Sequence, residues 1–219
     1  MIRLNRGAFH DSRVSPTVAA GIRGGEAITL TGRGHSQWRD DGRRYELAQV
    51  QVFTIDADLF VRSAPSTYDV VILDFPDPRS VELAKLYSVE FYRGIVQHLA
   101  PGGVIAVQST SPLRAKLVFS CIGQTLTAAG LRCLPFHDHV PSFGDWGWHL
   151  AWRGGPSVEE MRERLRQADP LPVPTDYVSP EVINSVFVFG KNTLTLDENV
   201  HINTKFRPVI LAYYERGVK

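Results

Sequence analysis

The alternation of apolar and polar positions is regular from residue 47 onward. Runs of strand length, either apolar throughout or alternating with polar residues, predict strands at 47–55, 68–74, 104–109, 131–140 and 146–153. Apolar residues three and four apart predict helices at 57–64, 88–100, 113–130 and 157–168. The nearly continuous apolar run at 68–74 is typical of a parallel strand covered on both faces. This order of strands and helices predicts a doubly wound, mostly parallel α/β sheet.

The two ends of the chain lack this regularity. The first 45 residues contain one predicted strand, at 27–31, and the stretch 32–44 is rich in Gly and Arg, as exposed or disordered basic segments are. Beyond residue 154, a polar helix and a proline-rich connector at 169–181 predict an appendage that folds back on the sheet. We therefore expect a divergent basic segment at 1–45, with disorder as one interpretation, and a domain at 46–219 whose appendage starts near residue 155.

Charge is balanced over the whole chain but uneven along it. The formal net charge of +1 provides no global field that would attract nucleic acid or an anionic membrane surface. Residues 1–44 hold eight Arg against four acids, so the remainder of the chain is net negative. That remainder favours a cationic substrate.

Cysteine usage and hydropathy indicate the compartment. Cys121 and Cys133 are the two cysteines and lack metal-ligand spacing, so we expect core thiols of a reducing compartment rather than a disulfide or a zinc site. The sequence contains no apolar run of the roughly 20 residues that span a bilayer, and its first residues lack the apolar core of a signal peptide. We expect a cytoplasmic protein without a membrane span in this chain.

Polar side chains follow three of the predicted strands. Asp56 follows the strand at 47–55, Asp74 ends the strand at 68–74, and Gln108 with Ser109 ends the strand at 104–109. In an open parallel sheet, ligands bind beyond the carboxyl ends of the strands. These side chains are therefore expected to converge on one edge of the sheet.

A second group of residues is expected to close the same edge. Asp77 lies just beyond the strand at 68–74, and the glycine-rich stretch 139–148 carries Phe143, Asp145 and Trp146. Taken singly, such an Asp is often a turn or cap residue, and such aromatic residues often serve packing. Together they predict an acidic pocket with aromatic walls, which suits an amine because carboxylates pair with ammonium groups and rings offer cation–π contacts.

The stretch 68–112, YDVVILDFPDPRSVELAKLYSVEFYRGIVQHLAPGGVIAVQSTSP, resembles the polyamine aminopropyltransferases, the spermidine synthase family. DADLFVRSAPSTYD at 56–69 and VPSFGDWGWHLA at 140–151 are similar to neighbouring motifs of that family. The PSFGDWG form, with YYERG at 213–217, is closest to a bacterial branch whose members often carry transmembrane helices before the synthase domain.

The resemblance implies a methyltransferase-type, Rossmann-like fold and a transfer reaction. The aminopropyl group of decarboxylated S-adenosylmethionine, a co-substrate, moves to putrescine or a related amine and leaves methylthioadenosine. Matched by position, Asp74 is the base that deprotonates the attacking amine. Asp77 holds the diamine with the help of Phe143, Asp145 and Trp146.

The remaining implied roles concern the nucleoside. Asp56 and Ala57 contact the adenine, and Gln108 lines the pocket. The reaction depends on in-line positioning with a sulfonium leaving group, so the resemblance implies neither a metal nor a tightly bound cofactor.

The amino-terminal part departs from the family pattern. A GGGDG donor loop is not recognisable, Gly32 and Arg33 stand where a ribose-binding acid is expected after the strand at 27–31, and the RGG at 23–25 precedes that strand. We therefore expect a sheet that is incomplete at its amino-terminal side. Three interpretations remain open: an active synthase whose donor site comes from residues 1–45, a homodimer or a partner; an S-adenosylmethionine-dependent N-methyltransferase; or an inactive or truncated remnant that acts as a binding subunit.

Overall fold

The computed structural model describes two classes of residues. Backbone and side chains are described for 53–64, 67–168, 175–194 and 200–217, and the backbone alone for 17–23, 26–31, 36–38, 44–46 and 49–52. No helix among these residues is long and apolar enough to cross a membrane.

Seven strands form one sheet in the order β5-β2-β1-β6-β7-β9-β8. Their bounds are β1 Thr17–Arg23, β2 Glu26–Thr31, β5 Gln49–Phe53, β6 Tyr68–Asp74, β7 Leu99–Gln108, β8 Arg132–Val140 and β9 Gly144–Trp152. The pairs β1–β6 and β6–β7 are parallel and the other four pairs are antiparallel. Five strands thus run in one direction, with β2 and β9 opposed, so the α/β class and the mostly parallel direction of the strands are confirmed. Strands β3 (Ser36–Trp38) and β4 (Arg44–Glu46) pair separately.

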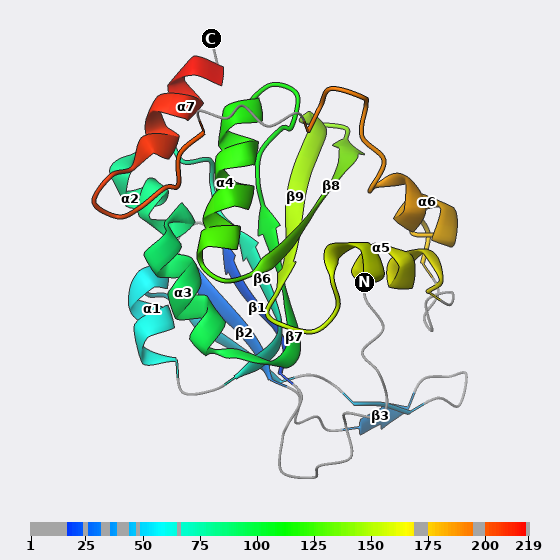
Figure 1. Cartoon of the computed structure of the whole chain (residues 1–219). Coiled ribbons are helices and arrows are strands. Elements are labelled where there is room, and N and C mark those ends of the chain that lie inside the picture. Colours follow the sequence, from blue (N-terminus) through cyan, green and yellow to red (C-terminus); the bar gives the residue numbers. More distant parts are fainter. Residues whose placement is uncertain are drawn as a thin grey trace.

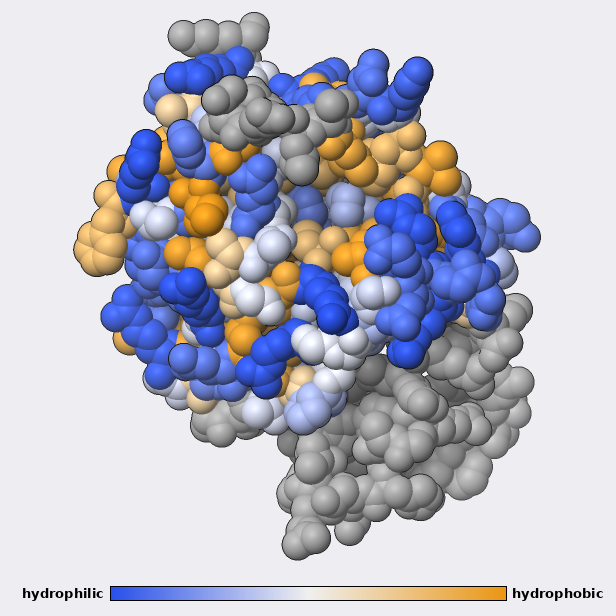
Figure 2. Space-filling view, in the orientation of Figure 1, coloured by the Kyte–Doolittle hydropathy of each residue, from blue (hydrophilic) through white to orange (hydrophobic). Residues whose placement is uncertain are grey.

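The helices lie on both sides of the sheet (Figure 1). They are α1 Ala57–Ser63, α2 Val81–Ala84, α3 Val89–Gln97, α4 Lys116–Ala128, α5 Val158–Arg166, α6 Pro180–Ser185 and α7 Val209–Gly217, with a 3-10 turn η2 at Lys85–Tyr87. The larger core joins α1, α3, α4 and α7 to one face of the sheet through residues such as Leu73, Ile105 and Ile122. The smaller core packs α5 against β7, β8 and β9 on the other face, through Met161 and Leu165. The outer surface of α5 is strongly hydrophilic, visible as deep blue at the right of Figure 2.

Local signals in the sequence explain where several helices begin and end. The Ser88 hydroxyl accepts from the Phe91 amide at the start of α3. Ser157 and Glu160 form a reciprocal capping box at the start of α5. Gly130 has a φ of 91° just beyond α4, a backbone conformation that glycine adopts without strain.

The prediction that residues 68–74 are covered on both faces holds for part of the strand only, because Val70 packs against the smaller core on the second face but Ile72 does not. Val71 and Leu73 are buried, but Ile72 is 43% exposed because α1, α3 and α4 cover one face of β6 and α5 covers the other face further along the sheet. A continuous apolar run thus does not distinguish a strand covered on one face from one covered on two.

The amino-terminal segment contributes strands to the main sheet. The expected strand at 27–31 is confirmed as β2, but β1 was missed, because its Ala-Ala-Gly centre has weak β-propensity. In the basic stretch 32–44, residues 36–38 form β3 and residue 44 begins β4, while 32–35 and 39–43 lie outside the described residues. The domain boundary near residue 45 stays a prediction.

Candidate active site

The carboxyl ends of the parallel strands meet at one edge of the sheet. Arg23 at the end of β1 lies opposite Asp74 at the end of β6. Strands β6 and β7 pair in parallel up to the residues just before Asp74 and Gln108. Trp148 of β9 lies opposite Gln108. The predicted convergence of Asp74 and Gln108 on one edge is therefore confirmed.

The side chain of Gln108 joins three segments at this edge. It is only 6% exposed. With its amide oxygen facing Trp146, that oxygen accepts from the indole Nε1 at 3.0 Å, and the amide nitrogen donates to the Phe75 carbonyl at 3.2 Å and to the Tyr87 hydroxyl at 3.1 Å. This arrangement satisfies both ends of a buried amide, so Gln108 fixes the 75–77 loop against β9.

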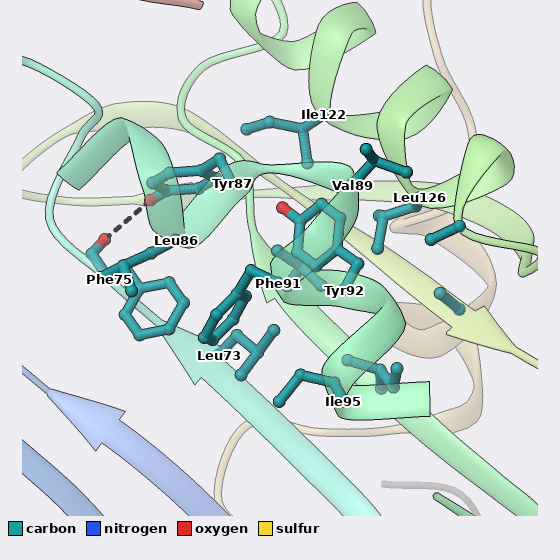
Figure 3. Packing of buried hydrophobic residues seen from close by; sticks show 14 of the residues in the cluster. Leu73, Phe75, Leu86, Tyr87, Val89, Phe91, Tyr92, Ile95, Ile122 and Leu126 are labelled. Atoms are coloured by element: carbon teal, nitrogen blue, oxygen red, sulfur yellow. Dashed lines mark hydrogen bonds between the residues drawn. The ribbon is translucent and has the colours of Figure 1, made fainter. Parts of the chain in front are cut away.

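Tyr87 supports the same loop from the core. Its hydroxyl lies 3.0 Å from the Pro76 carbonyl oxygen and 3.2 Å from that of Phe75, and Figure 3 shows it pointing at Phe75 beside Leu73 and Phe91. Burial raises the pKa of Tyr87 well above its ordinary value, and the negative charges of Asp77 and Asp74 raise it further. The phenol therefore remains a neutral hydrogen-bond donor beside two carboxylates.

Asp77 is held by a side chain from a distant part of the chain. Its Oδ2 accepts a hydrogen bond from the hydroxyl of Tyr214 on α7 at 3.3 Å. In the orientation given above, Gln108 turns its amide oxygen toward Trp146 and donates no hydrogen bond to Asp77. Tyr214 was missed as a site residue: YYERG served as a mark of the bacterial branch, and no periodicity shows that its second tyrosine reaches a loop 137 positions away.

Asp74 differs from Asp77 in its surroundings. Its carboxylate is exposed and has no hydrogen bond or ion pair among the side chains that the structure describes. Such a carboxylate, at the end of a rigid strand, is free to accept a proton or a cation from a ligand.

The three site residues predicted in the β8–β9 hairpin, Phe143, Asp145 and Trp146, do not all lie at the same place. Trp146 contacts Gln108, and its ring lies 5.1 Å from that of Phe143, which is 58% exposed. Asp145 instead faces His137 on β8, with Nδ1 to Oδ1 at 2.6 Å. Neighbouring strand residues point to opposite faces, so the structure brings Trp146 to the edge and pairs Asp145 elsewhere. A role of Asp145 in amine binding stays a prediction.

Asp56 is occupied by local contacts. Its carboxylate caps α1 through the amides of Asp58 and Leu59 and forms an ion pair of 2.7 Å with Lys85. The hydrogen bond from Lys85 lowers the pKa of Asp56, and the backbone amides add to that effect despite partial burial. Ala57 is buried in the core at 1% exposure. Contact of Asp56 and Ala57 with an adenine therefore stays a prediction.

A separate cleft of about 520 Å³ lies between α5 and the segment 184–194. Among the described residues it is lined by Arg162, Arg166 and Lys191, with Phe187 and Phe189. These cations would repel an ammonium group, so this cleft does not suit the amine that the acidic edge suits.

The fold and the site together define an α/β protein whose candidate ligand site lies at the carboxyl ends of its strands. Two solved structures share this fold over 66% of the chain. Spermidine synthase from Thermotoga maritima gives a TM-score of 0.52 at 20% identity over 50% of its own chain. A spermidine synthase in complex with the transition-state analogue AdoDATO gives 0.50 at 19% identity over 49% of its chain.

The family follows from the sequence comparison. The model of the spermine/spermidine synthase domain matches residues 36–161, more than half of the chain. The chain belongs to this family. The resemblance seen at 68–112 lies wholly within the matched residues.

Curated relatives are similar over part of their length. A polyamine aminopropyltransferase 2 of Ralstonia nicotianae is 38% identical over 142 residues, which are 65% of this chain and 26% of that protein. A polyamine aminopropyltransferase 1 of Streptomyces coelicolor is 38% identical over 76% of this chain and 30% of that protein. One from Bacillus cereus is 34% identical over 78% of this chain and 45% of that protein. The chain thus spans less than half the length of these three relatives.

Proposed function

We propose that this chain carries the amine-binding half of a polyamine aminopropyltransferase, which moves the aminopropyl group of decarboxylated S-adenosylmethionine to putrescine or a related amine. The observation that carries the proposal is the exposed carboxylate of Asp74 at the end of β6, next to the loop that holds Asp77. Membership of the spermine/spermidine synthase domain family supports the same reaction.

The two carboxylates are suited to different steps. Asp77, held by Tyr214, pairs with one ammonium group of the diamine. Asp74, without a partner among the described side chains, accepts the proton of the attacking amine. The rings of Phe143 and Trp146 add cation–π contacts worth about 0.5 to 2 kcal/mol each.

The transfer itself is a substitution at carbon. The nitrogen lone pair attacks the methylene carbon bonded to the sulfonium, the carbon–sulfur bond breaks, and sulfur keeps the electron pair as the thioether of methylthioadenosine. The proton lost by nitrogen goes to Asp74. Holding the amine and the donor in line supplies most of the acceleration in such a reaction.

Fewer described residues bear on the site for the nucleoside donor than on the site for the amine. The end of β1 lies beside Asp74, which is where a nucleoside donor would have to approach the attacking amine. A second copy of the chain or a partner subunit that supplies donor contacts is part of the proposal. The alternative is a binding subunit that holds the amine without turnover.

The test is turnover by the purified full chain. Decarboxylated S-adenosylmethionine and putrescine are supplied, and methylthioadenosine is measured. Asp74→Asn should lower the rate by about 10² to 10⁴-fold, the usual contribution of a general base. Asp69→Asn is the matched control, because Asp69 lies five residues earlier on the same strand, about 16 Å from the active edge.

The outcomes separate the alternatives. Methylthioadenosine formation that Asp74→Asn abolishes supports the proposal. Methyl transfer when S-adenosylmethionine replaces the decarboxylated donor would support an N-methyltransferase instead. Amine binding without product at high protein concentration would support the binding subunit. A fully active Asp74→Asn variant would mean that Asp74 is only a turn residue.

A further inference from the structure

The last described helix contributes a side chain to the acidic edge. Tyr214 is partly buried on α7, and its hydroxyl donates to Asp77 Oδ2 at 3.3 Å. Such contacts are often long in the unliganded state and shorten when substrate binds. This hydroxyl thus occupies one oxygen of the carboxylate that is proposed to anchor the amine.

Helix α7 is held firmly in place. Ile210 is fully buried and Tyr213 is 8% exposed, both within the larger core. At the end of α7, a Cβ on Gly217 would lie 3.1 Å from the Cα of Ala115, so the backbones approach closely there. Tyr214 therefore reaches Asp77 from a rigid element, as an accurately placed site residue requires.

A buried asparagine fixes the approach to this helix. Asn203 is fully buried; its Nδ2 donates to the Ala84 carbonyl at 2.9 Å, and its own amide donates to Thr125 Oγ1 at 3.0 Å. Its carbonyl accepts from the Val89 amide at 2.9 Å, and its Oδ1 accepts from the Ile210 amide at 3.4 Å. These bonds tie the segment before α7 to Ala84 and Val89, which flank the turn η2 that carries Tyr87, and to α4.

We propose that Tyr214 is a positioning residue of the amine site, an inference that rests on the proposed function. By holding Oδ2 of Asp77, Tyr214 keeps that carboxylate in one orientation and leaves Oδ1 for the ammonium group of the diamine. Tyr214 acts through Asp77 and touches no reacting atom, so it sets affinity for the amine and not the rate of transfer. The carboxyl-terminal helix is thereby part of the acceptor site.

The experiment compares Tyr214→Phe with Tyr213→Phe in the full chain. Tyr213 is the adjacent residue of the same helix, and its hydroxyl accepts from the His201 amide instead. Binding of putrescine is measured by calorimetry, and KM and kcat are measured where turnover occurs. Tyr214→Phe should weaken putrescine binding and raise KM by roughly tenfold, the loss expected for a hydrogen bond to a charged group, with kcat nearly unchanged. Tyr213→Phe should bind putrescine as the wild type does.

Failure of the inference and failure of the proposed function give different results. If the wild-type chain binds no diamine, the proposed function is overturned and the role of Tyr214 with it. If the wild type binds putrescine and Tyr214→Phe binds it equally well, the role of Tyr214 alone is overturned. A fall in kcat with unchanged KM would also contradict a positioning role.

The contact itself has a readout that needs no ligand. Burial raises the pKa of Tyr214, and the charge of Asp77 raises it further, while Arg79 lowers it. Asp77→Asn removes that negative charge, so alkaline absorbance titration should show the pKa of Tyr214 moving down toward the ordinary 10.0, while burial keeps the pKa of Tyr87 well above it. Tyr214→Phe identifies that transition by removing it. An unchanged titration curve in Asp77→Asn would show that the two side chains do not meet.

Discussion

His149 makes the stability of this protein sensitive to acid. The side chain is 3% exposed on β9, its Nδ1 lies 2.8 Å from Ser109 Oγ, and its ring packs 4.3 Å from that of Phe119. No carboxylate pairs with it among the side chains that the structure describes. Burial therefore lowers the pKa of His149 from 6.5 to about 3.

The sign of the effect follows from proton linkage. In the unfolded chain the imidazole takes up a proton as the pH falls below 6.5, whereas in the folded chain it stays neutral down to about 3. The unfolded state thus binds more protons in this window, and the stability present above pH 6.5 is lost as the pH falls through it. A pH of about 4.5 lies about 2 units below the pKa of the unfolded imidazole, so protonation of the unfolded state lowers the free energy of unfolding by roughly 3 kcal/mol.

Urea unfolding at about pH 7.5 and about pH 4.5 measures this loss. His149→Gln removes the titrating group and keeps a polar atom near Ser109, so its stability should fall by roughly 3 kcal/mol less than that of the wild type between the two pH values. His139→Gln, on the exposed side of β8, is the control and should keep the acid sensitivity of the wild type. The reasoning is refuted if His149→Gln loses as much stability on acidification as the wild type does.

Two further predictions concern buried positions, one on β9 and one on α4. Gly147→Ala should cost about 1 to 3 kcal/mol in thermal unfolding, because the new Cβ would clash with the buried ring of Phe119, whereas Gly190→Ala should change stability by less than about 0.5 kcal/mol. Equal melting temperatures for the two variants would contradict the clash. Burial raises the pKa of Cys121 to about 12, so a thiol-alkylating reagent at neutral pH should leave Cys121 unmodified in the folded protein, as mass spectrometry of the digested protein can show. Modification as fast as in urea would contradict that burial.

The central part of the fold could be predicted because its signals are local. The apolar runs at 68–74 and 104–109 became β6 and β7, and the helical spacing at 88–100 became α3 with its Ser88 cap. Because the carboxyl ends of parallel strands meet at one edge of a sheet, the strand assignments alone were enough to predict that Asp74 and Gln108 lie at the same edge.

The rest depended on contacts that no local pattern encodes. The pairing of Asp145 with His137 depends on the register of β8 and β9, which a sequence does not reveal before the hairpin is built. The exposure of Ile72 depends on which helices are present over β6. Strand β1 was missed because its small residues give little β-propensity, although it supplies the neighbour of Asp74.

The surroundings of the two carboxylates show how one edge can separate binding from proton transfer. Asp77 is held by Tyr214 of α7, so its orientation depends on a segment far along the sequence. Asp74 ends β6, with Arg23 of β1 opposite it in the register, and its carboxylate stays exposed. A carboxylate that anchors a cation binds it more tightly when its orientation is already fixed in the folded protein, because binding then costs less conformational entropy. A carboxylate that accepts a proton must instead remain accessible to the ligand. Under this proposal, helix α7 belongs to the amine site as much as the loop that carries Asp77 does.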